Sequence, residues 1–391
     1  MRDVAIIGVG VTEFGELWND SLRDLGIRAG LTAIVDAGIS SEDIDALYIG
    51  NMAAGRFVDQ EHIAPLIVDY AGLAGRNIPA IRVEAACASG GVAMHDGYLA
   101  VASGMYDTVV VGGAEKMTDV SDEEATEYLA MSADAQWEAF FGATFPSLFA
   151  LMARRHMHDY GTTREQLGAV AVKNHNHGAL NPMAQFRSRI TLDTVLKSGM
   201  VADPLTTFDC SPISDGAAAV VLCSVEKAKQ LGKDPGIRIT GSGVATDSLS
   251  LATRQDLTSL AGTRAAAARA FKQAKRTVKD VRVAEVHDCF TIAEIMALED
   301  IGFVEKGKGG KAVADGQFDL MGGQLPVNTS GGLKARGHPC GATGVAQIVE
   351  LVTQLRGKAE QRQVKGDPRV GLAHNVGGSG ATVTVHVVEV V

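Results

Sequence analysis

The sequence predicts a layered α/β protein in which most strands of the sheet run parallel. Short apolar runs alternate with helical patterns over residues 4–113, as expected of βαβ units. Glycine supplies 45 of the 391 residues and aromatic residues only 5%, and such a chain can pack helices closely against strands. The segments 85–113 and 331–377 share one succession of turn, small-residue helix, loop and strand, which indicates two related halves.

The elements of the first half follow from apolar periodicity. Val4–Val9 is an apolar run typical of a buried strand. Ser21 is a residue type that caps helices, and apolar residues follow it at helical spacing. Thr108–Val111 is typical of a strand buried on both faces. The expected elements are strands at 4–9, 46–49, 80–84 and 107–113 and helices at 22–37 and 88–103.

The middle of the chain differs from its flanks. Residues 115–203 are richer in Met, Phe, His and Asn and lack a strong strand pattern, so an inserted, mainly helical subdomain is expected. We predict an N-terminal half at 1–235, which includes this insertion, and a C-terminal half at 236–391. The remaining expected elements are helices at 146–159, 164–177, 290–301 and 341–356 and strands at 217–222, 236–241, 281–287, 369–374 and 381–388.

Charge and cysteine usage exclude several classes of protein. The formal net charge of -10 and the pI near 5.5 argue against binding to nucleic acid, which needs clustered positive charge. No apolar run reaches the ~18 residues of a membrane span, and the first residues lack a signal-peptide profile. Five cysteines without a CxxC pair argue against a zinc ribbon. Reduced thiols, a cytoplasmic location and no metal ion are therefore expected.

The first candidate for chemistry is Cys87 in the segment Glu84–Gly91. A strand ends there, small residues turn the chain, and a helix is expected to begin at the cysteine. The positive end of a helix dipole favours a thiolate, and the Cys87 N–H could stabilise an oxyanion. A free cysteine is more often a small buried hydrophobe, so both interpretations stay open on this segment alone.

Two further segments carry reactive side chains. His287, Asp288 and Cys289 follow an apolar run that does not need them to end a core strand, although an exposed loop could also carry them. In the segment 328–344, five glycines surround His338. Glycines let a ligand approach the backbone, and Pro339 fixes the chain after the histidine, as a general base requires. A glycine-rich surface turn is the alternative.

The segment His374–Gly380 lies between two expected strands. Its Gly-Gly-Ser-Gly loop offers backbone N–H groups with little steric cover, which suits an oxyanion wall. A plain hairpin turn is the alternative, and it is the favoured interpretation for His374. These loops each close a strand, and ligands of α/β sheets bind at the carboxyl ends of strands, so the candidates could converge if the halves pack together.

Taken together, these motifs resemble those of thiolases over essentially the whole chain. The HDCF version of the second motif is similar to that of sterol-carrier-protein-type thiolases and their archaeal acetyl-CoA acetyltransferase relatives. The matching landmarks are AACASGG around Cys87, HDCF at 287–290, NTSGG at 328–332, GHPCGATG around His338, the terminal glycine loop and the segment 211–219.

The resemblance implies a five-layered αβαβα thiolase fold with two pseudo-duplicated halves and an inserted helical loop domain. It implies a homodimer or homotetramer. It also implies reversible Claisen condensation of two acetyl-CoA to acetoacetyl-CoA and CoA through an acetyl-cysteine. CoA esters would be the substrates, with no prosthetic group.

The resemblance also implies roles for residues of this chain. Cys87 would attack the thioester, and His338 would activate Cys87 and line the first oxyanion pocket with support from His287. Cys289 would move the α-proton of the second acetyl-CoA. The second oxyanion hole would use the Cys87 N–H and an N–H of the glycine loop. The loop candidates are Gly377, Gly378 and Gly380, and the substrate-loop candidates are Asn328 and Ser330.

One departure from the common thiolase pattern affects the second thiol. Many thiolases place an acid/base cysteine in a Cys-x-Gly motif near the C-terminus, and the corresponding segment here, His374–Gly380, has no cysteine. Cys289 is therefore the choice for this role, as in the HDCF subgroup. Cys340, two residues after His338, is a competing candidate.

The resemblance suggests partners and also leaves rivals open. Archaeal relatives bind HMG-CoA synthase, an enzyme of the mevalonate pathway to isoprenoids, and a zinc-ribbon/OB-fold protein. No lipid-transfer domain follows the last strand, so sterol carriage is not implied. The rivals are a longer-chain 3-ketoacyl-CoA thiolase, a ketoacyl or HMG-CoA synthase relative, a retro-aldolase and a non-catalytic scaffold subunit. Cys289 argues against the synthases, which have no second catalytic thiol, and Cys87 argues against the retro-aldolase.

Overall fold

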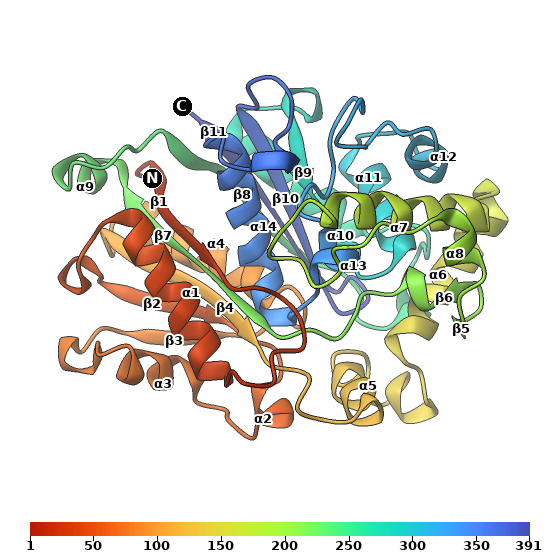
Figure 1. Ribbon diagram of the computed structural model, residues 1–391, viewed down its shortest axis with the longest axis horizontal. Coiled ribbons are helices and arrows are strands. Elements are labelled where there is room, and N and C mark those ends of the chain that lie inside the picture. Colours follow the sequence, from red (N-terminus) through yellow and green to blue (C-terminus); the bar gives the residue numbers. More distant parts are fainter.

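The computed structural model describes residues 1–391 and is built from strands and helices that alternate along most of the chain (Figure 1). The strands are β1 (Val4–Val11), β2 (Ala46–Gly50), β3 (Ala80–Val83), β4 (Thr108–Glu115), β5 (Met200–Ala202), β6 (Leu205–Thr206), β7 (Gly216–Ser224), β8 (Ile237–Thr246), β9 (Val283–Glu285), β10 (Val370–Gly377) and β11 (Thr382–Val390). The α-helices are α1 (Leu22–Ala37), α2 (Ala54–Phe57), α3 (Ile63–Tyr70), α4 (Ser89–Ala102), α5 (Asp122–Ala130), α6 (Phe145–Tyr160), α7 (Arg164–Gly178), α8 (Leu192–Leu196), α9 (Val225–Gln230), α10 (Ala261–Ala274), α11 (Thr291–Ile301), α12 (Gly309–Ala314), α13 (Gly332–Arg336) and α14 (Cys340–Leu355).

One nine-stranded sheet runs in the order β3-β2-β4-β7-β1-β8-β11-β10-β9. Its two parts touch only where β1 meets β8, through Val4 opposite Ile239 and Ala5 opposite Arg238. From this junction outward, β1-β7-β4-β2 of the first half corresponds to β8-β11-β10-β9 of the second. Val327 bridges to Ala284 of β9 at the place that β3 takes in the first half. The molecule therefore contains two halves with the same strand order.

The expectation of a mostly parallel sheet is wrong. Only the pairs β2–β3, β2–β4 and β9–β10 are parallel, and the other five are antiparallel. The last strand of each half returns beside the first one, and β10 and β11 are joined by a tight turn, which gives antiparallel strands. Both faces of these strands are covered, so their apolar runs do not reveal direction.

The helices form layers around the two parts of the sheet. Helices α1 and α3 cover the outer face of the first part and share an apolar core with it. Helices α10 and α11 pack in the apolar core of the second part. Between the two parts lie α4 and α14, which pack on each other and on strands of both halves. The layers follow the order αβαβα, as the resemblance implied.

A contact between glycines sets the separation of the two central helices. A Cβ atom on Gly344 would lie 2.2 Å from the backbone nitrogen of Gly91, and one on Gly90 would lie 2.6 Å from the carbonyl oxygen of Gly341. Only glycine permits so close an approach of two backbones. Both helices begin beside this crossing, so the turns that precede them meet, and these turns contain Cys87 and His338.

The segment between β4 and β7 carries α5 to α8 and the small pair β5–β6. Its helices α6 and α7 match the expected ranges closely, and they bury Phe149, Met152 and Leu167 against the core of the second half. In Figure 1 this segment, drawn in yellow and green, lies on the side away from α1. No helix in the chain is both long and apolar enough to cross a membrane.

Candidate active site

Cys87 lies in a tight turn between β3 and α4. The helix begins at Ser89 rather than at the cysteine. Ala86 has a φ of 51°, a left-handed conformation that non-glycine residues adopt only under constraint. The Ser89 hydroxyl supplies that constraint, because it donates to the Ala86 carbonyl at 2.6 Å and accepts from the Ala85 N–H at 2.9 Å. The turn therefore holds the Cys87 side chain in one place.

His338 lies in the corresponding turn before α14, and its ring is fixed by Thr343. The Thr343 hydroxyl donates to the Pro339 carbonyl at 3.0 Å and lies 2.7 Å from Nδ1 of His338. Since the hydroxyl proton is engaged with Pro339, its oxygen accepts from Nδ1–H. The neutral ring then carries its lone pair on Nε2. The Ser214 hydroxyl accepts the His338 backbone N–H at 2.9 Å and holds the turn itself.

Two thiols and this imidazole nitrogen converge at the helix crossing. The sulfur of Cys87 lies 3.6 Å from that of Cys340, and the Cys340 sulfur lies 3.8 Å from Nε2 of His338. All three atoms lie within 4.8 Å of one another. Cys340, which the sequence offered only as a competitor to Cys289, is therefore the direct neighbour of Cys87.

Hydrogen bonding and charge shift the pKa values of the two thiols in opposite directions. The pKa of Cys87 is lowered well below its usual range. The largest cause is the hydrogen bond with Cys340, and smaller contributions come from His338 and from the Gly378 N–H. The same hydrogen bond, burial and the charge of Glu115 raise the pKa of Cys340 well above its usual range. Cys87 is therefore the sulfur of this pair that ionises more readily, and Cys340 is its hydrogen-bond donor.

Glu115 is a buried carboxyl group at the start of α14. It accepts the N–H groups of Gly341 and Met52 at 2.9 and 2.8 Å, and the Asn51 amide donates to its other oxygen at 2.8 Å. Burial raises the pKa of Glu115 to about 7 despite these bonds. The carboxylate thus occupies the helix terminus that would otherwise favour a thiolate on Cys340.

His287 packs edge-on against His338, with ring centroids 5.2 Å apart, and Asn375 fixes its tautomer. The Asn375 side chain accepts the Gly91 N–H at 3.2 Å and donates to the Cys87 carbonyl at 3.0 Å, which settles its orientation. Its Nδ2 lies 3.1 Å from Nδ1 of His287. That nitrogen must then accept, so the proton is on Nε2, which is buried without a partner. Burial lowers the pKa of His287 well below its usual range and keeps the ring neutral.

Cys289 lines the same cavity as Cys87, His338 and Cys340. The cavity has a volume of about 140 Å³ and is walled mainly by apolar side chains, among them Phe149 and Phe290. Burial, and after it the charge of Cys87, raise the pKa of Cys289 well above its usual range. The Cys289 thiol is therefore protonated at neutral pH. It adds no negative charge to the cavity that it shares with Cys87.

The glycine loop is the hairpin turn between β10 and β11, and its glycines have different surroundings. Gly378 lines the cavity and contributes its N–H toward the Cys87 sulfur. Gly377 lines a neighbouring hollow instead. A Cβ on Gly380 would meet Leu260 and Arg254, away from the cavity. His374 is buried behind the loop, where Thr263 bonds its ring at 2.9 Å.

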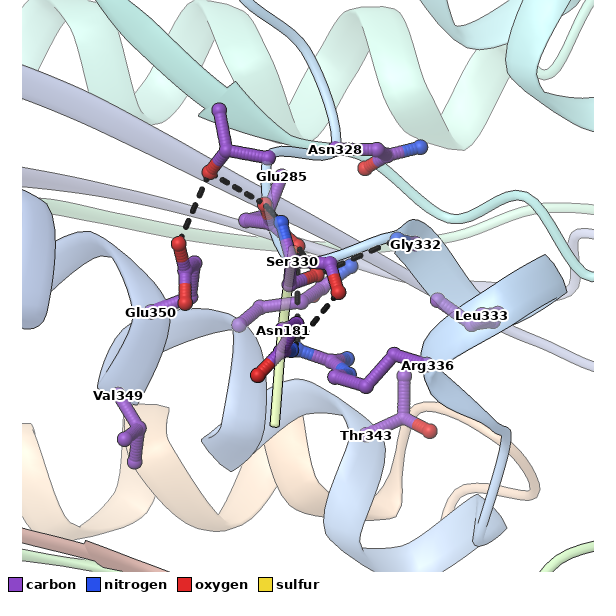
Figure 2. Close-up of polar contacts among 12 residues, drawn as sticks. Asn181, Glu285, Asn328, Ser330, Gly332, Leu333, Arg336, Thr343, Val349 and Glu350 are labelled. Carbon is purple, nitrogen blue, oxygen red and sulfur yellow. Dashed lines mark hydrogen bonds and ion pairs between the residues drawn. The ribbon is translucent and has the colours of Figure 1, made fainter. Parts of the chain in front are cut away.

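Asn328 and Ser330, the substrate-loop candidates, do not line the cavity. Figure 2 shows Ser330 in a buried polar cluster, where its hydroxyl donates to Glu285 at 2.5 Å and accepts the Gly332 N–H at 3.2 Å. Asn328 accepts the Val286 N–H at 2.8 Å through its side chain. These residues hold the HDCF turn and the His338 loop together from outside the cavity.

The side chains that orient the reactive groups were not singled out by the sequence. Thr343 and Asn375 stand inside the quoted motifs, but nothing in one chain's sequence connects Asn375 with His287, which lies 88 positions away. Ser214 likewise reaches His338 only through the fold. The i to i+5 spacing of His338 and Thr343 at a helix start was the one local signal available.

Sequence comparison extends the resemblance over both halves. Residues 4–226 match the family described as thiolase, N-terminal domain, and residues 243–390 match thiolase C-terminal domain-like. The acetyl-CoA acetyltransferase of Methanothermobacter thermautotrophicus is 55% identical and is covered over 99% of each chain. The corresponding enzyme of Methanocaldococcus jannaschii is 50% identical, over 100% of this chain and 99% of the relative.

Solved structures agree with these matches. The structure described as the Ltp2-ChsH2(DUF35) aldolase has a TM-score of 0.85 at 28% identity, over 99% of this chain and 98% of that one. Human mitochondrial 3-ketoacyl-CoA thiolase in complex with CoA has a TM-score of 0.77 at 18% identity, over 100% of this chain and 98% of that one, and at this identity it supports the fold alone.

Proposed function

The chain belongs to the thiolase family and is a thiolase acyltransferase, and we propose that it joins two acetyl-CoA molecules reversibly into acetoacetyl-CoA and CoA. The observation that carries the proposal is the Cys87 sulfur held near Nε2 of His338, which can take the thiol proton, in a short cavity. The two relatives at 50% identity or more bear the name of the same activity.

In the first half-reaction, the Cys87 thiolate attacks the carbonyl carbon of acetyl-CoA. The C–S bond to CoA breaks, and the CoA sulfur leaves with a proton that His338 carries on Nε2 after taking it from Cys87. The unpartnered Nε2–H of His287 is a donor suited to an oxyanion beside His338. The product of this step is acetyl-Cys87 and free CoA.

In the second half-reaction, Cys289 first gives its thiol proton to Nε2 of His338, which became neutral when CoA left, and the resulting thiolate removes an α-proton from a second acetyl-CoA. The resulting carbanion attacks the carbonyl of acetyl-Cys87, forming the new C–C bond and releasing the Cys87 thiolate. Thiolysis runs through the same steps in reverse. The Gly378 N–H, which faces the Cys87 sulfur, and the Cys87 N–H suit the oxyanion of the tetrahedral intermediate.

The cavity size supports a short acyl group. Its volume of about 140 Å³ is close to the ~150 Å³ that holds one benzene molecule, or about six heavy atoms. An acetoacetyl group has four carbons and two oxygens. A longer 3-ketoacyl chain would have to displace Phe149 or Phe290, which stack with centroids 4.6 Å apart.

An adjoining cavity supports a route for the CoA carrier. It has a volume of about 540 Å³ and shares Pro146 and the segment Cys210–Pro212 with the catalytic cavity. Arg187 and Lys334 line it, and no carboxylate does. The hollow beside Gly377 has arginines too, but Glu61 and Glu84 oppose them. The cavity at Lys334 is therefore better suited to bind the phosphate groups of CoA.

Partners and pathway are proposed on chemical grounds. Condensation of two acetyl-CoA is unfavourable, so an enzyme such as HMG-CoA synthase that consumes acetoacetyl-CoA at once would draw the reaction forward toward mevalonate. A structural neighbour is described together with a DUF35 protein, and we infer a similar partner here, with a homodimer or homotetramer as the core. The thiolate on Cys87 needs a reducing compartment such as the cytosol.

The test is turnover with defined substrates. Purified protein is incubated with acetoacetyl-CoA with and without free CoA, and with a longer 3-ketoacyl-CoA in parallel. We expect CoA-dependent conversion of acetoacetyl-CoA to acetyl-CoA and slower use of the longer ester. Faster use of the longer ester would instead assign a longer-chain thiolase, and no turnover of either would point to a scaffold subunit.

A further inference from the structure

The two sulfurs and the nitrogen at the helix crossing, each within 4.8 Å of the other two, are close enough to share one metal ion. In a tetrahedral zinc site with Zn–S bonds of about 2.3 Å and Zn–N bonds of about 2.0 Å, two sulfurs lie about 3.8 Å apart and sulfur and nitrogen about 3.5 Å apart. The observed separations are 3.6 Å between the sulfurs of Cys87 and Cys340 and 3.8 Å from Cys340 to Nε2 of His338. Shifts of a few tenths of an ångström would bring these two separations to coordination distances.

We propose that Cys87, Cys340 and His338 form an inhibitory binding site for a soft divalent cation, above all Zn²⁺. Two thiolates and one imidazole are a ligand set that zinc prefers. The fourth position of such a site opens to the catalytic cavity, and three protein ligands with one open position are typical of reactive zinc centres. Cys340 is the ligand that neither carries the acyl group nor transfers a proton to substrate in the proposed reaction.

The surroundings of His338 meet the requirements of a metal-binding histidine. Its Nδ1–H donates to Thr343, so the lone pair of Nε2 points to the thiols without a change of tautomer. Histidines that bind metals almost always donate their other ring nitrogen to such a partner. The histidine is therefore preorganised for a cation as well as for a proton.

Charge and proton balance also favour the bound state. Two thiolates neutralise the charge of Zn²⁺, which lowers the cost of placing the ion in a buried cavity. On binding, Cys340 gives up its thiol proton to solvent, and so does the Cys87–His338 pair when it holds a shared proton. No oxidant or reductant takes part, and a chelator reverses the binding. The bound Cys87 sulfur cannot attack a thioester.

The test is cobalt and zinc titration of the whole protein, stripped with a chelator and kept in a phosphine reductant. Co²⁺ should produce thiolate-to-metal charge-transfer absorption and the visible bands of four-coordinate cobalt, and one equivalent of Zn²⁺ should abolish both. Cys340→Ser should weaken Zn²⁺ binding by more than about 100-fold, because losing an outer-shell partner alone costs about 10–100-fold. Cys210→Ser, a cysteine of the same cavity wall, should leave the affinity unchanged.

A second readout uses the unaltered protein. Zn²⁺ should protect Cys87 from alkylation by iodoacetamide, and a chelator should restore the reaction. The proposal fails if wild-type protein shows no charge-transfer band, or if Cys340→Ser, with an unchanged Tm, binds Zn²⁺ as tightly as wild type. These measurements need no acyltransferase activity, so they stand or fall independently of the proposed reaction.

Discussion

The N-termini of α4 and α14 occupy equivalent places in the two halves, yet the cysteines beside them have opposite character. Cys87 faces the Gly378 N–H and the imidazole of His338. Cys340 is the first residue of α14, where the Glu115 carboxyl group already accepts the Gly341 N–H. One thiol thus ionises more readily and the other is its hydrogen-bond donor.

A helix N-terminus therefore does not by itself make a cysteine reactive. Cys340 is the first residue of a sixteen-residue helix, whereas Cys87 precedes its helix by two positions. The groups that face each sulfur decide which one ionises. The duplicated fold supplies two equivalent turns, and the buried carboxyl group makes them unequal.

Removing the sulfur of the first turn should have the largest effect. We expect Cys87→Ala to fold normally and to lose acyl-enzyme formation, with kcat reduced by at least about 10⁴-fold, as for other lost nucleophiles. Rapid-quench measurement of protein-bound acetyl groups checks this. Normal turnover in this variant would overturn the assignment of Cys87.

His338→Ala should slow acylation by about 10²–10⁴-fold, the contribution of a general base. The Nε2 lone pair beside the thiols is then missing, although both sulfurs remain. Thr343→Val should have a smaller effect in the same direction, because only the orientation of the ring is lost. An unchanged acylation rate in His338→Ala would remove this histidine from the mechanism.

The second thiol is tested by separating the two half-reactions. Cys289→Ala should still form acetyl-Cys87 but condense or thiolyse about 10²–10⁴-fold more slowly. Cys223→Ala, a change of a buried free cysteine in β7 outside the cavity, serves as the control. Single-turnover kinetics with acetyl-CoA followed by the second substrate distinguishes these steps. If Cys340→Ala instead acylates normally and is slow only in condensation or thiolysis, the roles of Cys289 and Cys340 are exchanged.

The helix crossing is tested by adding one methyl group. Gly344→Ala should lower the free energy of unfolding by about 1–3 kcal/mol, because the new Cβ would press on the backbone of Gly91. Gly30→Ala in α1 meets no atom within 4 Å and should instead gain about 0.5–1 kcal/mol through helix propensity. Urea unfolding of both variants checks the contrast, and equal destabilisation would contradict the close-contact explanation.

The hydrogen bond between the thiols is tested by pH dependence. Only the thiolate reacts with iodoacetamide, and the lowered pKa of Cys87 means that its alkylation should begin below the pH expected for a cysteine of pKa ~8.5. Cys340→Ala removes the donor, so the pKa should rise and the profile should move to higher pH. A profile that does not move would show that Cys340 does not stabilise the thiolate.

The sequence predicts most elements because apolar periodicity is local, whereas the αβαβα order of the layers was implied by the resemblance. It misses the antiparallel strands, since buried strands of either direction carry the same residue types. Among the site residues, the motif glycines and reactive side chains are visible as unusual local patterns. Asn375, Ser214 and the pairing of Cys87 with Cys340 are not, because each depends on contacts between segments far apart in the chain.

The most direct measurement of the central claim is the position of the acetyl group. The protein is mixed with acetoacetyl-CoA, quenched in acid and digested with trypsin, which separates Cys87 in residues 83–116, Cys289 in 283–306 and Cys340 in 337–356. We expect an acetyl group on the Cys87 peptide alone, and we expect free CoA to remove it. An acetyl group on the Cys340 peptide instead would contradict the assignment of Cys87.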